Sequence, residues 1–392
     1  MRILFYSVAP WHKSGYGKVC YNICSRLKKH YEVDILGYTH FGTPIEYKGL
    51  MVYPALNFED KFATAALKVW YEHLKPDIIF QFFDLWVLGG RLHTYGYPYI
   101  AYPPIDCIPV QAPMIEDLKH AVAIFAMTRF AQKQLKEIGL ESCYVPHGVD
   151  TGIYKPMNQK ECRRIFNLPE DAFIFGFVGT NFSERKNIPG LLRAFKKFID
   201  STKASPEEVK LLLWTYIHKD DLNPFGDELP AYFQQLGITK YICYPNELQY
   251  WVGLSEEQMS ILYNCIDVYV TASSGEGFGL PVLEAMACGK PVIAPNFSSH
   301  PELIQEPELL ARVAEYQARN RIMSFQAIVD TSDLAEKMKR LYEEPSLTRL
   351  YGQKMREKAL EYDWETVINK YMLPALEESL KPEKTFYPPA SN

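Results

Sequence analysis

The sequence predicts an α/β protein made of two doubly wound domains. The chain has 392 residues, which is enough for two domains of ordinary size. Apolar runs of strand length alternate with helical patterns in both halves of the chain, as in parallel sheets covered by helices. A stretch of turn residues at 147–157 separates the halves. We therefore expect a linker there and a separate core in each half.

The first half begins with a predicted strand, a glycine loop and a helix. Residues 3–8 form the apolar run, residues 14–17 contain two glycines, and residues 18–30 have helical spacing. A second strand at 33–37 completes a strand–helix–strand unit, which implies a parallel pair with a right-handed crossover. Further predicted strands lie at 77–82, 99–102, 121–127 and 143–146, and helices at 64–74 and 131–139.

The second half repeats this alternation and ends in helices. Its predicted strands lie at 173–179, 210–215, 267–272 and 291–294, and its helices at 189–199 and 281–288. Helices are then expected at 332–342, 347–362 and 364–380, with a break at Pro374, before a proline-containing tail. The predicted domains are residues 1–155 and 156–364. Residues 365–392 are predicted to form a helix that crosses back to the first domain, followed by the tail.

Composition argues against several other classes of protein. The net charge is -5 and no basic stripe is present, so we expect no binding of nucleic acid. No apolar run approaches the length of about 18 residues that spans a membrane, and no signal peptide is visible. The eight cysteines are scattered without a C-x-x-C pair, as expected for small core residues in a reducing compartment. The predicted location is cytoplasmic, with contact to a membrane surface left open.

The segment 274–292 reads SGEGFGLPVLEAMACGKPV and carries the strongest signal of chemistry. It predicts a strand end, a glycine loop and a helix with Pro281 in its first turn. The amides of residues 277–280 then lie at a helix N-terminus, where unpaired N–H groups and the helix dipole favour an anion. Carboxylates such as Glu276 and Glu284 suit sugar or ribose hydroxyls because they accept hydrogen bonds. A generic strand–loop–helix unit with solvated glutamates is the structural alternative.

This segment resembles glycosyltransferase family four, also called group 1, which shows glutamate, seven residues and glutamate in this frame. The resemblance implies the GT-B fold, two Rossmann-like doubly wound domains facing a central cleft, and retention of anomeric configuration. It implies that Glu276 binds hydroxyls of the transferred sugar and Glu284 the ribose diol. The implied contacts of the diphosphate and sugar are the backbone amides of Gly277, Phe278, Gly279 and Leu280.

A cationic pair is the second signal. Arg185 and Lys186 follow the predicted strand that ends at Gly179, and they stand where cations neutralise a leaving diphosphate. Lys186 matches the lysine of the family, and Gly179 is included in the predicted donor site. The family often has an arginine directly after the glycine, whereas Thr180 stands here, so Arg185 is the candidate to replace it. A surface Arg–Lys pair is the structural alternative.

The first half resembles the family more loosely. Gly15 and Gly17 match its glycine loop near the donor phosphate and are predicted to bind the donor. Asp106 is a candidate catalytic residue, but Ile105 precedes it where many family members have a histidine. A solvated loop carboxylate is the alternative for Asp106.

Two further positions are candidates for a structural role. His147 lies at the predicted hinge, where a linker role is expected and a role in the cleft is the alternative. Trp364 is expected to anchor the last helix.

The predicted activity is transfer of a mannose- or glucose-like hexose from a GDP-, UDP- or ADP-sugar to a hydroxyl of a glycan, lipid or small molecule. No cofactor and no metal are expected, because no D-x-D pair stands in a metal-site context. A catalytically weak or inactive nucleotide-sugar-binding protein is the alternative from another class. A third hypothesis is an epimerase or a phosphorylase with the same fold, but no sequence motif supports it. The sequence leaves the base, the sugar, the acceptor and the oligomeric state open.

Overall fold

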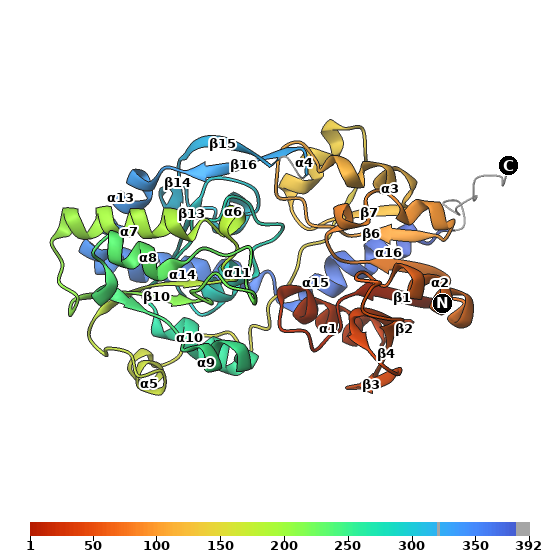
Figure 1. Cartoon of the computed structure of the whole chain (residues 1–392), viewed down its shortest axis with the longest axis horizontal. Coiled ribbons are helices and arrows are strands. Elements are labelled where there is room, and N and C mark those ends of the chain that lie inside the picture. Colours follow the sequence, from red (N-terminus) through yellow and green to blue (C-terminus); the bar gives the residue numbers. More distant parts are fainter. Residues whose placement is uncertain (320–321, 382–392) are drawn as a thin grey trace. The chain divides into compact units, whose positions relative to one another are not determined.

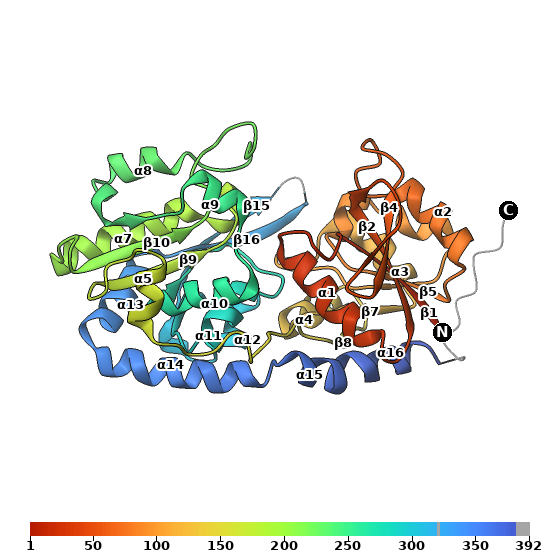
Figure 2. The same cartoon turned by 90° about the horizontal axis from the view of Figure 1, so that it is seen from below.

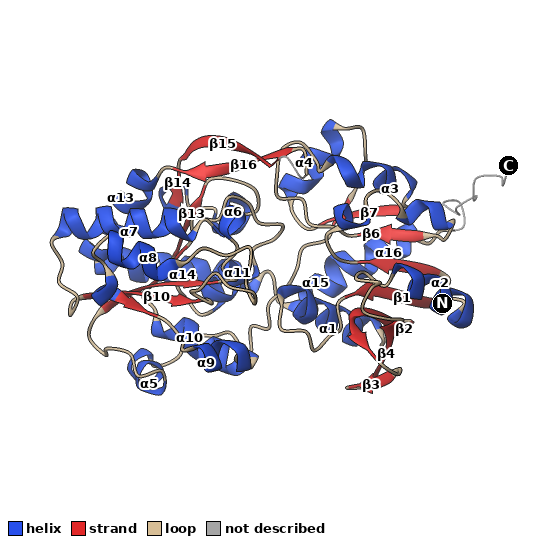
Figure 3. Cartoon of the chain, viewed as in Figure 1, coloured by secondary structure: helices blue, strands red, loops and turns tan. Residues whose placement is uncertain are grey.

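The computed structural model describes residues 1–319 and 322–381 and divides the chain into two compact units (Figure 1). The first unit comprises residues 1–148, 319–324 and 364–392, and the second comprises 149–318 and 325–363. Helices and strands alternate in both units, as Figure 3 shows by colour. The predicted α/β class is confirmed, while the domain limits at 155 and 364 stay predictions.

The first unit is built on an eight-stranded sheet with the order β3-β4-β2-β1-β5-β6-β7-β8. All neighbouring strands are parallel except β3 and β4, which form an antiparallel pair at one edge. The strands are β1 Arg2–Ser7, β2 Glu32–Phe41, β3 Ile45–Tyr47, β4 Leu50–Ala55, β5 Ile78–Gln81, β6 Tyr99–Ala101, β7 Ala123–Ala126 and β8 Cys143–Tyr144. Sequence analysis did not predict β3 and β4. The edge strand β3 is short and exposed, whereas β4 is mostly buried and its apolar run at 50–55 was an available signal.

Helices cover the first sheet, and aromatic residues fill its core. The helices are α1 Gly15–Leu27, α2 Thr64–Leu74, α3 Ile115–His120, α4 Arg129–Glu137, α15 Trp364–Val367 and α16 Leu373–Ser379. The ring of Phe5 on β1 stacks on that of Phe80 on β5, with centroids 4.9 Å apart. Tyr6, the next residue of β1, faces the opposite side and packs edge-on against Phe83. Alternate residues of β1 therefore enter two apolar layers, which explains its unbroken apolar sequence.

The last helical segment is interrupted as predicted near Pro374. A π-helical turn at Ile368–Met372 precedes α16, because Pro374 has no N–H to continue the regular ladder. Trp364 at the start of this segment is fully buried. A Cβ on Gly148 would lie 2.6 Å from the Trp364 ring, so the glycine lets the indole pack directly on the backbone. The expectation that Trp364 acts as a packing anchor fits these contacts.

The second unit contains a six-stranded parallel sheet with the order β11-β10-β9-β12-β13-β14 and a separate two-stranded sheet, β15-β16. The strands are β9 Phe173–Val178, β10 Val209–Trp214, β11 Ile242–Cys243, β12 Val268–Val270, β13 Val292–Pro295, β14 Leu310–Ala311, β15 Val313–Arg319 and β16 Ser324–Val329. The four strands predicted in this half correspond to β9, β10, β12 and β13.

Helices lie on both faces of this sheet (Figure 2). They are α5 Gln159–Ile165, α6 Ser183–Lys186, α7 Ile188–Thr202, α8 Leu229–Gln235, α9 Glu247–Val252, α10 Glu256–Cys265, α11 Leu280–Ala287, α12 His300–Ile304, α13 Thr331–Glu343 and α14 Pro345–Leu360. Phe175 on β9 faces α7, where it contacts Phe198 at 5.1 Å between centroids. Its neighbour Gly176 faces the opposite side against Ile266, which follows α10. The sheet is therefore doubly wound.

Two general features complete the description of the chain. In the part that the structure describes, no helix is both long and apolar enough to cross a membrane. All eight cysteines are free thiols, and six of them are buried. These six occupy interior positions as small apolar side chains, as the sequence predicted for most of the cysteines.

Candidate functional site

The order of the strands in the second unit brings three loops together. The chain runs outward from β9 to β10 and β11 on one side, and from β12 to β13 and β14 on the other. The sheet therefore has its topological switch point between β9 and β12, where doubly wound folds bind ligands at the carboxyl ends of the strands. The loops after β9, β12 and β13 all end at this edge, because these strands are adjacent and parallel.

Glu276, in the loop after β12, contacts both candidate cations. Its carboxylate accepts a hydrogen bond from Arg185 Nη1 at 2.8 Å and forms an ion pair with Lys186 Nζ. Ser273 Oγ donates a further hydrogen bond to it at 2.6 Å. The backbone also joins the two loops, because Ser274 N donates to Arg185 O at 2.7 Å. Arg185 and Lys186 belong to the short helix α6, rather than to the coil expected before the next helix.

This cluster of charges is poorly accessible to water. The side chain of Lys186 is 9% exposed and that of Glu276 is 12% exposed, while Arg185 is half-buried. Burial by itself would raise the pKa of Glu276. The charges of Lys186 and Arg185, with hydrogen bonds from Lys186 and Ser273, outweigh burial and hold this pKa well below its usual range. The carboxylate is therefore ionised at neutral pH, and two cations share one anion.

The glycine loop ends at the N-terminus of α11, as the sequence predicted. Gly279 precedes the helix in the left-handed region at a φ of +96°, which a residue with a Cβ adopts only with strain. Pro281 occupies the first turn, where its missing N–H costs no hydrogen bond. The amides of residues 277–280 therefore lie at a helix start that carries a partial positive charge. Phe278 is buried and packs edge-on against Tyr362, and this contact holds the glycine loop in place.

Glu284 lies in the fifth position of α11 and is also buried, at 5% exposure. Its Oε2 accepts a hydrogen bond from the hydroxyl of Tyr263 on α10 at 2.9 Å. The two glutamates of the motif therefore have different partners. Glu276 is paired with charges, whereas Glu284 accepts a hydrogen bond from a neutral hydroxyl.

The turn after β13 adds polar groups that sequence analysis did not single out. Ser298 has a φ of 52°, and its Oγ accepts the backbone N–H of Glu276 at 3.0 Å. His300 is fully buried, and its Nδ1 lies 3.1 Å from Pro295 O, which makes Nδ1 the protonated nitrogen. Burial lowers the pKa of His300 to about 4, although Glu276 acts in the opposite direction. The imidazole is therefore neutral at pH 7.

Three buried polar atoms around these loops lack a hydrogen bond within residues 1–319 and 322–381. They are Ser274 Oγ, Ser299 Oγ and His300 Nε2. Ser299 Oγ lies 3.3 Å from the position that a Cβ on Gly279 would occupy, so it borders the glycine loop. An unmet buried hydrogen-bonding group costs about 1–3 kcal/mol, and such groups are rare in folded proteins. A polar ligand or bound water at the switch point would satisfy them.

The corresponding place in the first unit is the switch point between β1 and β5. The predicted glycine loop is in fact the cap and first turn of α1: Ser14 is the N-cap, and Gly15 and Gly17 are helical. A Cβ on Gly17 would lie 2.1 Å from His12 O, so this position has no room for a side chain. Tyr16 donates a hydrogen bond to Asp84 Oδ2, after β5, at 2.9 Å.

The remaining candidates of the first unit occupy different environments. Asp106 is half-buried in the loop after β6, where its Oδ1 accepts a long hydrogen bond from Gln111 at 3.4 Å. Ile105 is part of the hydrophobic core, so the place where the family has a histidine is filled by packing. His147 is buried edge-on against Phe82 and Tyr102, and burial lowers its pKa to about 3. Its position is that of a core histidine of the first unit.

Sequence analysis missed the contributions of Asp84, Tyr263, Ser298 and His300. Asp84 and Ser298 each follow a strand at a carboxyl end, which was an available signal. Tyr263 lies within an apolar helix pattern, where nothing distinguishes a buried hydroxyl that bonds a glutamate from an ordinary core tyrosine.

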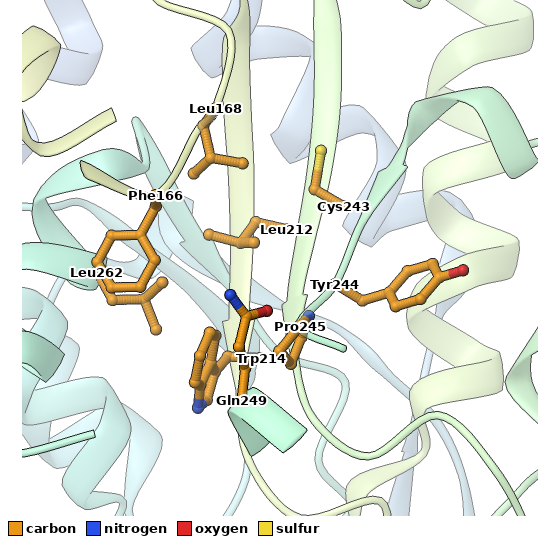
Figure 4. A pocket seen from close by; sticks show the side chains of 9 residues that line it. All are labelled: Phe166, Leu168, Leu212, Trp214, Cys243, Tyr244, Pro245, Gln249 and Leu262. Carbon is orange, nitrogen blue, oxygen red and sulfur yellow. The ribbon is translucent and has the colours of Figure 1, made fainter. Parts of the chain in front are cut away.

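The second unit also has a small cavity of about 60 Å³ (Figure 4). Leu212 and Trp214 of β10 point into it, together with Cys243 of β11. The other lining residues are Phe166, Leu168, Tyr244, Pro245, Gln249 and Leu262. None of the predicted donor-site residues lines this cavity. Within the described residues, no group of three or more His, Cys, Asp or Glu side chains is arranged as a metal site.

Comparisons with known proteins agree with this geometry. Residues 172–344 match the model of the family described as "Glycosyl transferases group 1". The O-antigen chain mannosyltransferase B of Escherichia coli is 30% identical over 161 residues, 40% of this chain and 38% of that protein. The D-inositol 3-phosphate glycosyltransferase of Actinosynnema mirum is 24% identical over 221 residues, 56% of this chain and 48% of that protein. The aligned part thus spans less than half the length of these relatives.

Solved structures are similar over nearly the whole chain. Sucrose-phosphate synthase from Thermosynechococcus elongatus has a TM-score of 0.77 at 19% identity, covering 97% of this chain and 99% of that one. Anabaena HepE in complex with UDP and glucose has a TM-score of 0.70 at 16% identity, covering 96% and 100%. These similarities define the class of protein as a GT-B fold. More narrowly, residues 172–344 match the group 1 glycosyltransferases, the family that the motifs indicated.

Proposed function

We propose that the protein transfers a mannose- or glucose-like hexose from a nucleotide-diphosphate sugar to a hydroxyl of a glycan, lipid or small molecule, with retention of configuration. The cluster of Arg185, Lys186 and Glu276 at the switch point of the second unit carries this proposal. Named relatives that are mannosyltransferases, and a fold neighbour described with UDP and glucose, support the choice of donor class. A cytoplasmic location is part of the proposal, with membrane contact if the acceptor is a lipid.

The chemistry follows from the charges at this site. As the glycosidic bond breaks, negative charge accumulates on the diphosphate, and Arg185 and Lys186 neutralise it. The amides at the start of α11 bind the same group through the helix dipole. Glu276 accepts hydrogen bonds from sugar hydroxyls, and Glu284 accepts them from the ribose diol. The acceptor hydroxyl attacks from the face that the diphosphate leaves, so the enzyme contributes positioning and stabilisation of the leaving group.

We also propose that no divalent metal is required, because two side-chain cations already neutralise the charge of the diphosphate. We expect activity to persist in excess EDTA. Loss of activity in EDTA with recovery on addition of magnesium would overturn this part. Release of free nucleotide only in the presence of an acceptor would separate transfer from epimerase or phosphorylase chemistry.

A thermal-shift panel tests the donor site. UDP, GDP, ADP and their hexose conjugates are added to the wild type, to Glu284→Ala and to Glu336→Ala, an exposed glutamate on α13 that serves as a control. A nucleotide at about 100 times its dissociation constant adds about 2.7 kcal/mol to the free energy of unfolding. We expect one base to stabilise the wild type and the control but not Glu284→Ala. If no nucleotide stabilises the wild type, the proposed function is wrong.

One observation favours a second candidate, a nucleotide-sugar-binding protein without efficient catalysis. Ile105 fills with core packing the place where many relatives have a histidine, and Thr180 is exposed where they often have an arginine. A protein of this kind would show the same nucleotide shift but no release of nucleotide with any acceptor. Measurable turnover with one acceptor would exclude this candidate.

A further inference from the structure

Tyr263 and Glu284 form a buried pair between two helices of the second unit. The hydroxyl of Tyr263 donates to Glu284 Oε2 at 2.9 Å, and the two residues are 0% and 5% exposed. Tyr263 comes from α10 and Glu284 from α11, the helix whose first turn follows the glycine loop. The hydrogen bond therefore connects the motif helix to a neighbouring helix that contains none of the predicted site residues.

The surroundings hold Tyr263 in this position. Its ring lies between those of Tyr154 and Tyr269, with centroids 6.1 Å and 6.2 Å away. Burial raises the pKa of Tyr263 well above its ordinary value, so its hydroxyl remains a hydrogen-bond donor at all physiological pH values. The side chain of Glu284 has three torsion angles. Because packing fixes the Tyr263 hydroxyl, its hydrogen bond restricts these angles before a ligand binds.

We propose that Tyr263 is a positioning residue for the nucleotide ribose, because its hydroxyl fixes the direction in which the Glu284 carboxylate accepts the ribose diol. This inference rests on the proposed function, since only a bound nucleotide supplies the ribose. Without the hydroxyl, the carboxylate samples other rotamers, and binding has to restrict them at the expense of affinity. Tyr263 itself does not need to touch the ligand.

The chain contains a matched control for this role. Tyr269 is a buried tyrosine of the same unit, and its hydroxyl donates to the backbone carbonyl of Val178 at 3.1 Å. Tyr263→Phe and Tyr269→Phe each remove one buried hydroxyl with one hydrogen bond. Both should lose similar thermal stability, but only the first should change how the protein binds nucleotide.

The experiment measures dissociation constants of UDP, GDP and ADP, and of their dideoxy analogues that lack both ribose hydroxyls. For the base that binds the wild type, we expect Tyr263→Phe to weaken the ribonucleotide about tenfold and the dideoxy analogue hardly at all. Tyr269→Phe should leave both affinities unchanged. In a Glu284→Ala background, Tyr263→Phe should cause no further loss, because the group that it positions is gone.

The outcomes separate this inference from the proposed function. If the wild type binds no nucleotide, the proposed function fails and the inference fails with it. If the wild type, Tyr269→Phe and Tyr263→Phe all bind the nucleotide with the same affinity, the proposed function stands and the inference is wrong. The inference is also wrong if Tyr263→Phe weakens the ribonucleotide and the dideoxy analogue by the same factor, because the hydroxyl then supports the fold rather than the ribose contact.

Discussion

The two units have the same topological feature, a switch point in a doubly wound sheet, but different chemistry at that place. In the first unit, the neutral hydroxyl of Tyr16 donates a hydrogen bond to Asp84 across it. In the second unit, the carboxylate of Glu276 is buried with the cations Arg185 and Lys186. Buried ion clusters are costly to assemble and add little stability by themselves. The fold supplies a switch point in both units, and the charge cluster distinguishes the second unit from the first.

The family match is confined to the same unit. It covers residues 172–344, which lie in the second unit except for the short segment 319–324. Under the proposed function, the second unit holds the donor and the first unit holds the acceptor. The following predictions test this division of roles.

The largest effect is expected from removal of one cation. Lys186→Gln should lower turnover about 100- to 1,000-fold, because one of two side-chain cations that stabilise the leaving diphosphate is lost. It should also reduce the thermal shift by nucleotide. Asp84→Asn at the switch point of the first unit should leave that shift unchanged. Steady-state rates and thermal shifts measure both effects. Loss of the nucleotide shift in Asp84→Asn would break the assignment of the donor to the second unit.

A second test compares a glycine from each unit. Gly17→Ala should destabilise the protein by about 3 kcal/mol, because the new Cβ would lie 2.1 Å from His12 O and the loop must move. Gly279→Ala should cost about 1–2 kcal/mol, since alanine is strained at a φ of +96°. Urea unfolding gives both values. We expect Gly279→Ala to weaken nucleotide binding more than its stability loss explains, and unchanged binding by this variant would contradict its place in the donor site.

The smallest effect concerns pH and involves one histidine from each unit. Burial lowers the pKa of His300 to about 4 and that of His147 to about 3, below the value of about 6.5 in the unfolded chain. The unfolded state therefore binds more protons as pH falls below about 6.5, and stability decreases in that direction. At pH 5, each histidine should cost about 2 kcal/mol relative to pH 8.

Urea unfolding of the wild type, His147→Asn and His300→Asn at pH 5 and pH 8 measures this effect. Asparagine does not titrate but keeps a donor close to the position of Nδ1. Each variant should therefore show a smaller difference between the two pH values than the wild type. A difference equal to that of the wild type would show that the replaced histidine is not the titrating group. Glu276 does not contribute to the change in stability between pH 5 and pH 8, because its lowered pKa affects stability only at more acidic pH.

Sequence reasoning was most successful where a local pattern decides the structure. The alternation of buried strands and helices predicted the sheets, and the motif at 274–292 predicted the glycine loop, α11 and the positions of Glu276 and Glu284. It failed for the exposed strands β3 and β15, for the more buried strands β4 and β16, and for the helical state of Gly15 and Gly17. Exposure removes the apolar periodicity from β3 and β15, and the cap at Ser14 brings both glycines into the helix.

The sequence by itself determined the fold class, the resemblance to the group 1 glycosyltransferases and the residues of the charge cluster, because these depend on short-range patterns and on a motif within one loop and helix. Only the tertiary structure decided which residues meet. Adjacency of β9, β12 and β13 brings Lys186, Glu276 and Ser298 to one edge of the sheet, although more than 100 residues separate the first from the last. Packing between α10 and α11 likewise pairs Tyr263 with Glu284. Such contacts follow from the order of strands and helices in space, which local sequence does not specify.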